Sequence, residues 1–394
     1  MGWAMALLIW LHVVAAIAWI GESFYFVMLD NSLHPPDEAI AKQRGVFGEL
    51  WAVHGGGFYH SQKYLVSPPR MPEDLHWSKW KSYVTWLSGF SLLIVMYLLQ
   101  PGIYLIDPSV AALTPLTAAG AVLGFLLAGW LVYDTACRLL GARDLVLGIV
   151  IAAFVGVACY GSTHLFGAQA AFLIVGAMLG TIMTANVFFV IIPGQRKMVD
   201  ALARGETPDP LPGKRGKQRS VHNTYFTLPV VFAMLSSHFS MLYGGRANWL
   251  ALWLAMLGGA LIRQYFVLRH TGRQDWKLPA SAVAIFIGLI VAAAPAGRLG
   301  MAAPAEGAGA AVVKTAAIMP IIAARCAPCH AAHPRLMASA PAGIMFDTEA
   351  EIRGHAAVIE QQVVQVKAMP PGNVTHITKA ERAAIGRWFD DGAK

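Results

Sequence analysis

The chain alternates between long apolar runs and short polar connections. Eight apolar runs of about twenty residues, the length that a helix needs to cross a bilayer, lie at 4–29, 82–99, 117–136, 145–160, 169–192, 225–243, 249–268 and 280–296. The first run lacks a positively charged start and a small-residue cleavage site, so it is predicted to be a retained helix and not a signal peptide. The pattern predicts an all-α bundle of eight transmembrane helices over residues 1–300.

Lysine and arginine residues gather in alternate connections. Segments 30–81, 138–144, 193–223 and 269–277 carry six, two, seven and three of them, whereas 100–116 and 161–168 carry none. Because basic connections stay on the cytoplasmic side, the chain is predicted to lie in a bacterial inner membrane with both termini in the periplasm. The net charge of +8 then reflects topology, and no nucleic-acid partner is predicted.

The last part of the chain has a different composition. Residues 301–312 are rich in Ala, Gly and Pro and are predicted to be a flexible linker. The segment that follows, 313–394, contains Cys326-Ala327-Pro328-Cys329-His330, a C-x-x-C-H motif. In such a motif the two thiols bind the vinyl groups of a haem as thioethers, and the histidine ligates its iron.

Two other uses of this cysteine pair fit poorly. A structural zinc site needs four nitrogen or sulfur ligands, and the chain has no second C-x-x-C. A thioredoxin-type pair needs a βαβ context, whereas the flanks here are typical of short helices. Residues 313–394 are therefore predicted to be a periplasmic cytochrome c domain that holds haem c through Cys326 and Cys329, with His330 on the iron.

The second axial ligand of the haem iron is predicted to be Met369. It stands in Lys367-Ala368-Met369-Pro370-Pro371, where the two prolines stiffen the loop, and His/Met ligation raises the haem potential into the electron-transfer range. Four other side chains in the domain are competitors for this position: His333, Met337, Met345 and His355. Residues 381–389 have apolar positions at helical spacing and predict a terminal helix.

Polar residues inside the apolar runs are costly and are therefore candidate functional groups. Those toward the periplasmic side are histidines: His12, His164 and His238. Facing imidazoles are the usual means by which a helix bundle holds haem, so we hypothesise a haem b between His12 and at least one other histidine, relaying electrons to haem c. Hydrogen bonding to a neighbouring helix is the alternative role.

The polar residues toward the cytoplasmic side suit a polar substrate site. They are Glu22, Asp134 and Arg263, with Asn186 and Gln264 as further members. A second candidate is the glycine-rich stretch from His54 to Tyr64, in which His54 and His60 could contact a planar anion; a turn with an interfacial aromatic belt is its alternative. A third candidate is the segment 219–225 at the start of the sixth apolar run. Its alternative is a helix cap with basic anchors.

Several of these segments resemble the membrane-bound bacterial urate oxidases that carry a fused cytochrome c. The resemblance rests on His54-Gly55-Gly56-Gly57-Phe58-Tyr59, Gln62-Lys63-Tyr64, Leu75-His76-Trp77, Gly176-Ala177-Met178-Leu179-Gly180-Thr181-Ile182-Met183, Ile192-Pro193-Gly194-Gln195, His222-Asn223-Thr224-Tyr225 and Ser237-His238. It extends over nearly the whole chain. It implies oxidation of urate to 5-hydroxyisourate in purine degradation, with electrons leaving through the haem toward a cytochrome c oxidase or another respiratory acceptor.

A second resemblance concerns the first helix alone. The stretch from Leu11 to Gly21 is similar to the opening helix of membrane protoporphyrinogen oxidases and copper-resistance membrane proteins, which implies a haem or metal contact for His12. This resemblance, which covers one helix only, supports His12 as a ligand.

The reaction requires groups that take protons and groups that hold the purine oxygens. Asp134 or Glu22 is assigned as the base, and Arg263, Asn186 or Gln264 as the donor. Two rival functions remain open at this point: an electron-transfer anchor that serves a separate dehydrogenase, and a protein that handles haem or metal.

Overall fold

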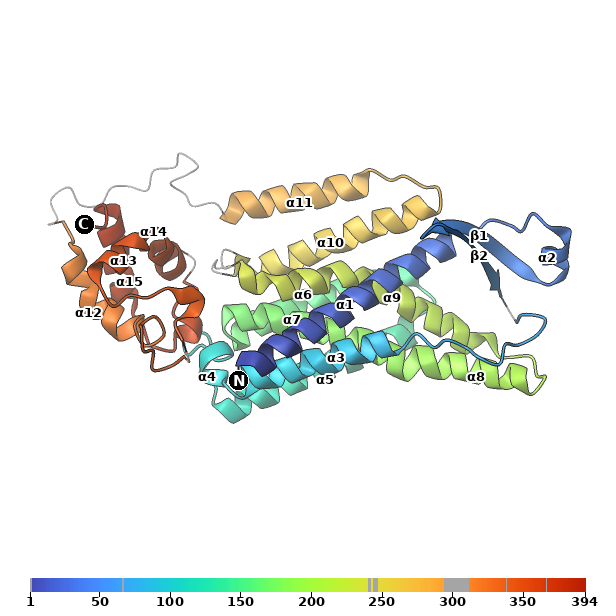
Figure 1. Cartoon of the computed structure of the whole chain (residues 1–394), viewed down its shortest axis with the longest axis horizontal. Helices are drawn as coiled ribbons and strands as arrows, with labels where there is room; N and C mark the ends of the chain where they lie inside the picture. The colour runs from blue at the N-terminus through green and yellow to red at the C-terminus, as the bar shows by residue number, and fades with distance from the viewer. Residues whose placement is uncertain are drawn as a thin grey trace.

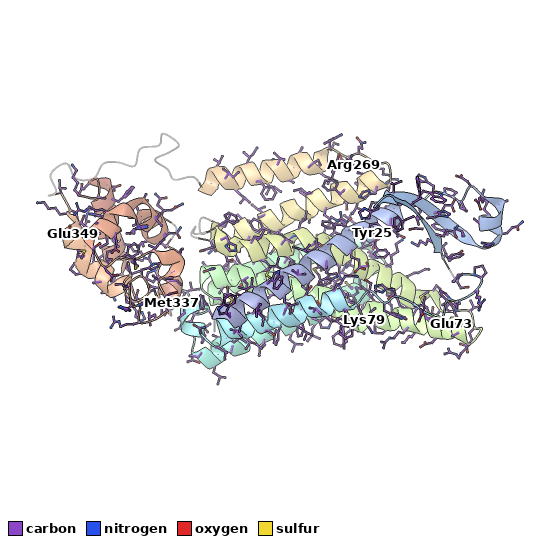
Figure 2. The ribbon with its side chains drawn as sticks, in the orientation of Figure 1. Tyr25, Glu73, Lys79, Arg269, Met337 and Glu349 are labelled. Atoms are coloured by element: carbon purple, nitrogen blue, oxygen red, sulfur yellow. The ribbon has the colours of Figure 1, made fainter. Side chains whose placement is uncertain are left out.

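The architecture is a bundle of long helices with a β-hairpin at one end and a small helical domain at the other (Figure 1). A computed structural model describes residues 2–65, 67–239, 242–243, 247–293, 312–337, 339–365 and 367–394. The N-terminus lies at the same end of the bundle as the C-terminal domain, residues 312–394 (Figure 1). The opposite end is called the hairpin end, and Figure 2 places the charged residues Glu73, Lys79 and Arg269 toward it.

Except for α9, the long helices of the bundle follow the predicted apolar runs. They are α1 (Gly2–Asn31), α3 (Trp80–Leu92) with η1 (Leu93–Leu98), α5 (Pro115–Leu140), α6 (Asp144–Leu165), α7 (Ala168–Ala185) with η2 (Asn186–Ile191) and α8 (Ile192–Ala203), α9 (Pro210–Leu235), α10 (Asn248–His270) and α11 (Lys277–Ala293). Two short helices, α2 (Ala39–Gln43) and α4 (Pro101–Tyr104), lie in connections.

Six helices in the described part of the chain are long and apolar enough to cross a membrane. The other two predicted spans correspond to α9 and α11. The first half of α9 is basic, and the described part of α11 has 17 residues. Membrane insertion agrees with this architecture, and the count of eight crossings stays a prediction.

The boundaries of α9 differ from the predicted run 225–243. The helix begins at Pro210, because the Asp209 side chain accepts a hydrogen bond from the Leu211 N–H at 2.9 Å and proline suits the first helical turn. It ends at Leu235 and is followed by a short 3-10 turn, η3 (Ser236–His238). Hydropathy alone missed the polar half of this helix. Residues 240–241 of the predicted run lie outside the described residues.

The centre of the bundle is α7. Its side chains Phe172, Ile174, Met178 and Ile182 are almost fully buried. Gly176 lets α9 approach closely, since a Cβ at this position would lie 2.8 Å from the Ala233 Cβ. Most large apolar side chains of α1 are by contrast exposed, which is compatible with a helix that faces lipid.

The structure is mostly helical, as predicted, with one exception. The glycine-rich stretch forms an antiparallel hairpin of β1 (Val46–His54) and β2 (Gly57–Tyr64). Gly55 and Gly56 take positive φ angles of 59° and 80° in the two-residue turn, which is the geometry that short hairpins require. The all-α prediction is therefore wrong in this segment. Its glycines were interpreted as a ligand-binding loop, but two of them form the turn of a hairpin.

The C-terminal domain has its own apolar core. Its elements are α12 (Thr315–Arg325), η6 (Pro341–Gly343), α13 (Glu349–Gly354), α14 (Ala356–Ile359), η7 (Glu360–Gln365), η8 (Pro371–Asn373) and α15 (Lys379–Asp390). The first and last helices are joined where the Trp388 indole N–H donates to Thr315 Oγ1 at 3.1 Å. The predicted terminal helix 381–389 is confirmed within α15, which a Thr378–Glu381 capping box starts.

Candidate functional site

The C-x-x-C-H motif begins directly where α12 ends. The chain turns so that the His330 N–H donates to the Cys326 carbonyl oxygen at 2.9 Å. Cys326 and Cys329 are both buried and both free thiols. Burial raises the pKa of Cys326 to about 12 and raises that of Cys329 as well. The two sulfurs are thus held as neutral thiols on one turn, available for thioether formation.

The orientation of His330 is fixed by the backbone. Its Nδ1 lies 3.0 Å from the carbonyl oxygen of Ile344. A carbonyl can only accept, so Nδ1 carries the proton and Nε2 of the neutral ring keeps its lone pair. This is the arrangement that iron-ligating histidines use, with one nitrogen satisfied by a second group and the other on the metal.

Met369 shares an apolar cluster with the motif. Cys326, Ile322 and Phe346 belong to this cluster, and Met369 packs against it. The backbone of Met369 is held on both sides: its N–H donates to the Gln362 carbonyl oxygen at 3.1 Å, and its carbonyl oxygen accepts from Arg382 at 2.8 Å. The competitor His355 donates from Nδ1 to the Glu351 carbonyl oxygen, which leaves its Nε2 free as in His330. The residues at the motif therefore fit a covalently bound haem.

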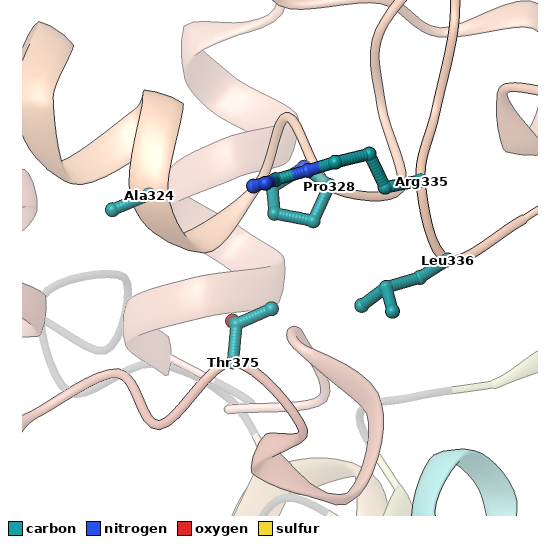
Figure 3. A pocket seen from close by; sticks show the side chains of 5 residues that line it. All are labelled: Ala324, Pro328, Arg335, Leu336 and Thr375. Carbon is teal, nitrogen blue, oxygen red and sulfur yellow. The ribbon is translucent and has the colours of Figure 1, made fainter.

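An open hollow of about 380 Å³ adjoins the motif. Figure 3 shows the five side chains that line it: Ala324, Pro328, Arg335, Leu336 and Thr375. The hollow lies between the motif loop and the segment that follows Met369. Among the described residues, no group of three or more His, Cys, Asp and Glu side chains is placed to hold a bare metal ion. A prosthetic group with its own ring ligands needs no such group.

A buried polar network joins three helices near the hairpin end of the bundle. Arg219 of α9 donates to Asp134 Oδ1 of α5 at 2.7 Å and to Asn186 Oδ1 at 3.4 Å. Asn186 donates in turn to the Tyr133 hydroxyl at 3.1 Å and to Asn223 Oδ1 at 2.8 Å. The structure thus brings together the predicted residues Asp134 and Asn186, in a network whose buried atoms satisfy one another.

The network also includes the imidazole of His222. The Tyr133 hydroxyl lies 2.8 Å from His222 Nδ1, and the Cys137 sulfur lies 3.7 Å from the same nitrogen. Asp134 also accepts from the exposed Arg138 at 2.6 Å. Two arginines from different helices therefore share this one carboxylate, which orients the Arg219 guanidinium inside the network.

Arg263 lies elsewhere, between α10, α1 and α9. Its side chain is buried, and Nε and Nη2 have no hydrogen-bond partner among the described residues. The guanidinium carbon lies 4.1 Å from the centre of the Phe24 ring. Next to it, the Tyr225 hydroxyl donates to the Gln264 side chain. A buried cation without a partner is costly, so this position is poised to receive an anion.

The remaining predicted substrate and catalytic residues are not joined to these groups by any hydrogen bond in the described part of the chain. Glu22 accepts from Lys81 at 2.7 Å and from Ser78 at the start of α3. His60 pairs with Glu49 at 2.9 Å and stacks on Trp51, and His54 ends β1 at the hairpin turn. Burial opposes ionisation of Glu49, but hydrogen bonds from Asp37, Gln62 and His60 outweigh it and lower the pKa. The contacts of His60 with Glu49 and Trp51 thus join the two strands of the hairpin.

The three histidines predicted to hold a haem b lie in different settings. His12 Nδ1 donates to the Thr85 carbonyl oxygen of α3 at 3.0 Å, and the ring lies over Gly89. The exposed His164 donates to the Tyr160 carbonyl oxygen at 2.7 Å, and the exposed His238 lies in η3. Of the three, His12 alone is half-buried against a neighbouring helix, with Nε2 left as the lone-pair nitrogen.

Four members of the polar network were given no role from the sequence: Tyr133, Arg219, His222 and Asn223, the last three of which stand in the candidate segment 219–225. A signal was present, because Arg219, His222 and Asn223 stand at helical i, i+3, i+4 spacing and so share one face. The segment looked like a basic helix cap because the helix start at Pro210 was not recognised. Hydropathy began the predicted membrane span at residue 225, which placed Arg219, His222 and Asn223 outside the bundle.

A family model described as "Urate oxidase N-terminal" matches residues 1–294. No curated protein and no solved structure matches the chain.

Proposed function

The chain belongs to the urate oxidase N-terminal family, and we propose that it oxidises urate to 5-hydroxyisourate and delivers the electrons to a c-type haem in its own C-terminal domain. The family match covers the helix bundle and supports an oxidoreductase that acts on urate. The observation that carries the haem half is the setting of His330, whose Nδ1 is bonded to Ile344 while two buried thiols stand beside it.

The reaction balances with water as the oxygen source. Urate and one water give 5-hydroxyisourate, two protons and two electrons. Haem c, when bound through Cys326 and Cys329 with His330 and Met369 on its iron, would accept these electrons one at a time and pass them to a respiratory acceptor such as a cytochrome c oxidase. Oxygen is then not a direct reactant at this protein.

Arg263 is the residue best placed to hold the urate anion. Its fork of N–H donors matches the oxygen and ring-nitrogen edge of an anionic purine, and two of its nitrogens are unpaired among the described residues. Gln264 is the adjacent amide donor, and the Phe24 ring bounds one side. Asp134 and Glu22 hold the cations Arg219 and Lys81, so we assign them to positioning instead of proton transfer.

His12 supports the further proposal of a haem b in the bundle. It precedes Phe24 by twelve residues on α1, which places it about 18 Å nearer the C-terminal domain along the helix axis. A centre at His12 would lie between the Arg263–Phe24 region and the C-terminal domain and would divide the electron path into two shorter steps. A pyridine haemochrome assay of pure protein should then show b-type haem in addition to haem c, and haem c alone would contradict it.

The proposed location is a bacterial inner membrane with the C-terminal domain in the periplasm. Figure 1 supports it, because the basic connections around α2, the hairpin and α8 lie at one end and the haem motif at the other. Such segregation is what basic cytoplasmic connections produce.

The test is the visible spectrum of detergent-purified protein before and after anaerobic addition of urate. Reduced c-type bands should appear with urate and be missing in Cys326→Ala. If dithionite reduces the haem but urate does not, the cytochrome c assignment holds and urate is not the substrate. The chain would then be an electron-transfer anchor for a separate dehydrogenase.

A further inference from the structure

The loop that follows Met369 is seated on the helix bundle. Its element η8 lies against α4, and Ala368 packs against the main apolar core of the bundle. Gly372 sits at the tip with a φ of +54°, and a Cβ there would collide with the Ile106 carbonyl oxygen and lie 3.3 Å from that of Ile103. No residue other than glycine fits this contact without moving one of the two domains.

The bundle supplies a shaped seat for this glycine. The Gly167 N–H donates to the Leu105 carbonyl oxygen at 2.9 Å, which joins the α6–α7 turn to the segment after α4. A Cβ on Gly167 would lie 3.9 Å from the Gly372 Cα. The junction is therefore a close fit between backbone groups of the two domains.

The same loop is tied to the candidate iron ligand. Met369 and Gly372 are three residues apart, and the Arg382 guanidinium donates a hydrogen bond to the Met369 carbonyl oxygen. Figure 2 shows Met337 on the side of the domain that faces the bundle and Glu349 on the far side. Thr375, which lines the hollow beside the motif, follows Gly372 by three residues. The docked face is thus the face that carries the ligand loop.

We propose that Gly372 is the docking contact that seats the C-terminal domain on the bundle, and that this junction is where electrons pass from the bundle to haem c. The electron half rests on the proposed function, whereas the docking half does not. Docking of this kind keeps the haem edge at a fixed separation from the bundle, instead of leaving it to chance encounters on a tether.

The test compares two glycine substitutions that share the same backbone cost. Gly372 and Gly343 both have positive φ, +54° and +69°, and both stand in short Pro-containing 3-10 turns, but a Cβ on Gly343 would meet nothing within 4 Å. Gly372→Val and Gly343→Val are made in the full-length holoprotein. A third variant, Gly167→Phe, fills the seat from the bundle side and leaves the C-terminal domain unaltered.

The first readout is amide hydrogen exchange of residues 101–107, on the bundle side. Exchange there should rise by about tenfold or more in Gly372→Val and Gly167→Phe and stay at the wild-type rate in Gly343→Val. The second readout is haem reduction: the rate with urate should fall by about tenfold or more in the first two variants, while reduction by ascorbate should not change.

Unchanged exchange at residues 101–107 in both Gly372→Val and Gly167→Phe overturns the docking. Raised exchange with an unchanged urate-driven rate overturns the electron route. If urate fails to reduce the wild-type haem, the proposed function falls, and the exchange data still decide the docking. A normal haem spectrum in Gly167→Phe shows that the C-terminal domain itself is intact.

Discussion

Arg263 and Phe24 lie face to face in the bundle, with the guanidinium carbon 4.1 Å from the ring centre and two guanidinium nitrogens unpaired among the described residues. The aromatic face offsets part of the cost of burying this cation. A ligand that brings a negative charge and hydrogen-bond acceptors would offset the rest. Binding and stability should therefore respond to this residue in opposite directions.

Replacing Arg263 should weaken urate binding and leave the fold at least as stable. In Arg263→Met we expect KM for urate to rise by about tenfold or more, and the free energy of unfolding to be unchanged or about 1 kcal/mol higher, because an unsatisfied buried group is removed. Steady-state kinetics and thermal unfolding measure the two effects. The control is Arg269→Met on the exposed end of the same helix, and a lost fold in Arg263→Met would show a structural role instead.

Met369 should set the potential of the haem. In Met369→Leu we expect haem c to stay attached through Cys326 and Cys329 and its midpoint potential to fall, because the thioether ligand that raises it is lost. Spectroelectrochemical titration measures the potential. Met337→Leu and Met345→Leu are the matched controls, and a fall in either of them with no change in Met369→Leu would move the ligand assignment.

The Asp134–Arg219 pair should behave as a coupled buried unit. Asp134→Leu leaves the Arg219 charge without its main partner, and we expect it to cost about 3–5 kcal/mol of unfolding free energy. The double variant Asp134→Leu, Arg219→Met should cost less than the sum of the single changes. The exposed Arg138, replaced by Met, should change the stability by less than about 1 kcal/mol. Additive costs would argue against the coupling.

The C-terminal domain should lose stability in acid through Glu381. Burial opposes ionisation of this carboxyl, but hydrogen bonds from the Thr378 N–H and the Arg325 guanidinium favour the carboxylate and lower its pKa below 4.5. A depressed pKa in the folded state gives stability that is present above pH 4.5 and is lost as the pH falls through the folded value. Thermal unfolding of the holoprotein between pH 3 and pH 6 should therefore show a smaller acid loss in Glu381→Gln than in wild type. Glu349→Gln, at an exposed pair with Arg353, should keep the wild-type slope.

Local sequence was enough for features that depend on neighbours along the chain. The apolar runs specified helices because lipid leaves backbone polar groups no other partner, and the Thr378–Glu381 capping box starts the terminal helix within its own first turn. The C-x-x-C-H spacing likewise predicts Cys326, Cys329 and His330 as haem-binding residues from local sequence, and this assignment stays a prediction. In each case, residues a few positions apart carry the whole signal.

Contacts between distant segments were decided only by the tertiary structure. The sequence singles out Asp134, but only the packing of α9 against α5 brings Arg219 to it, from 85 residues away in the chain. The local sequence of the glycine-rich stretch is compatible with both a ligand-binding loop and a hairpin turn. The antiparallel pairing of its flanking strands, with Trp51 opposite His60, shows that it is a hairpin. The seat of Gly372 depends on two carbonyl groups more than 260 residues earlier in the chain. Such a contact is set by where backbones meet in space, which no local pattern encodes.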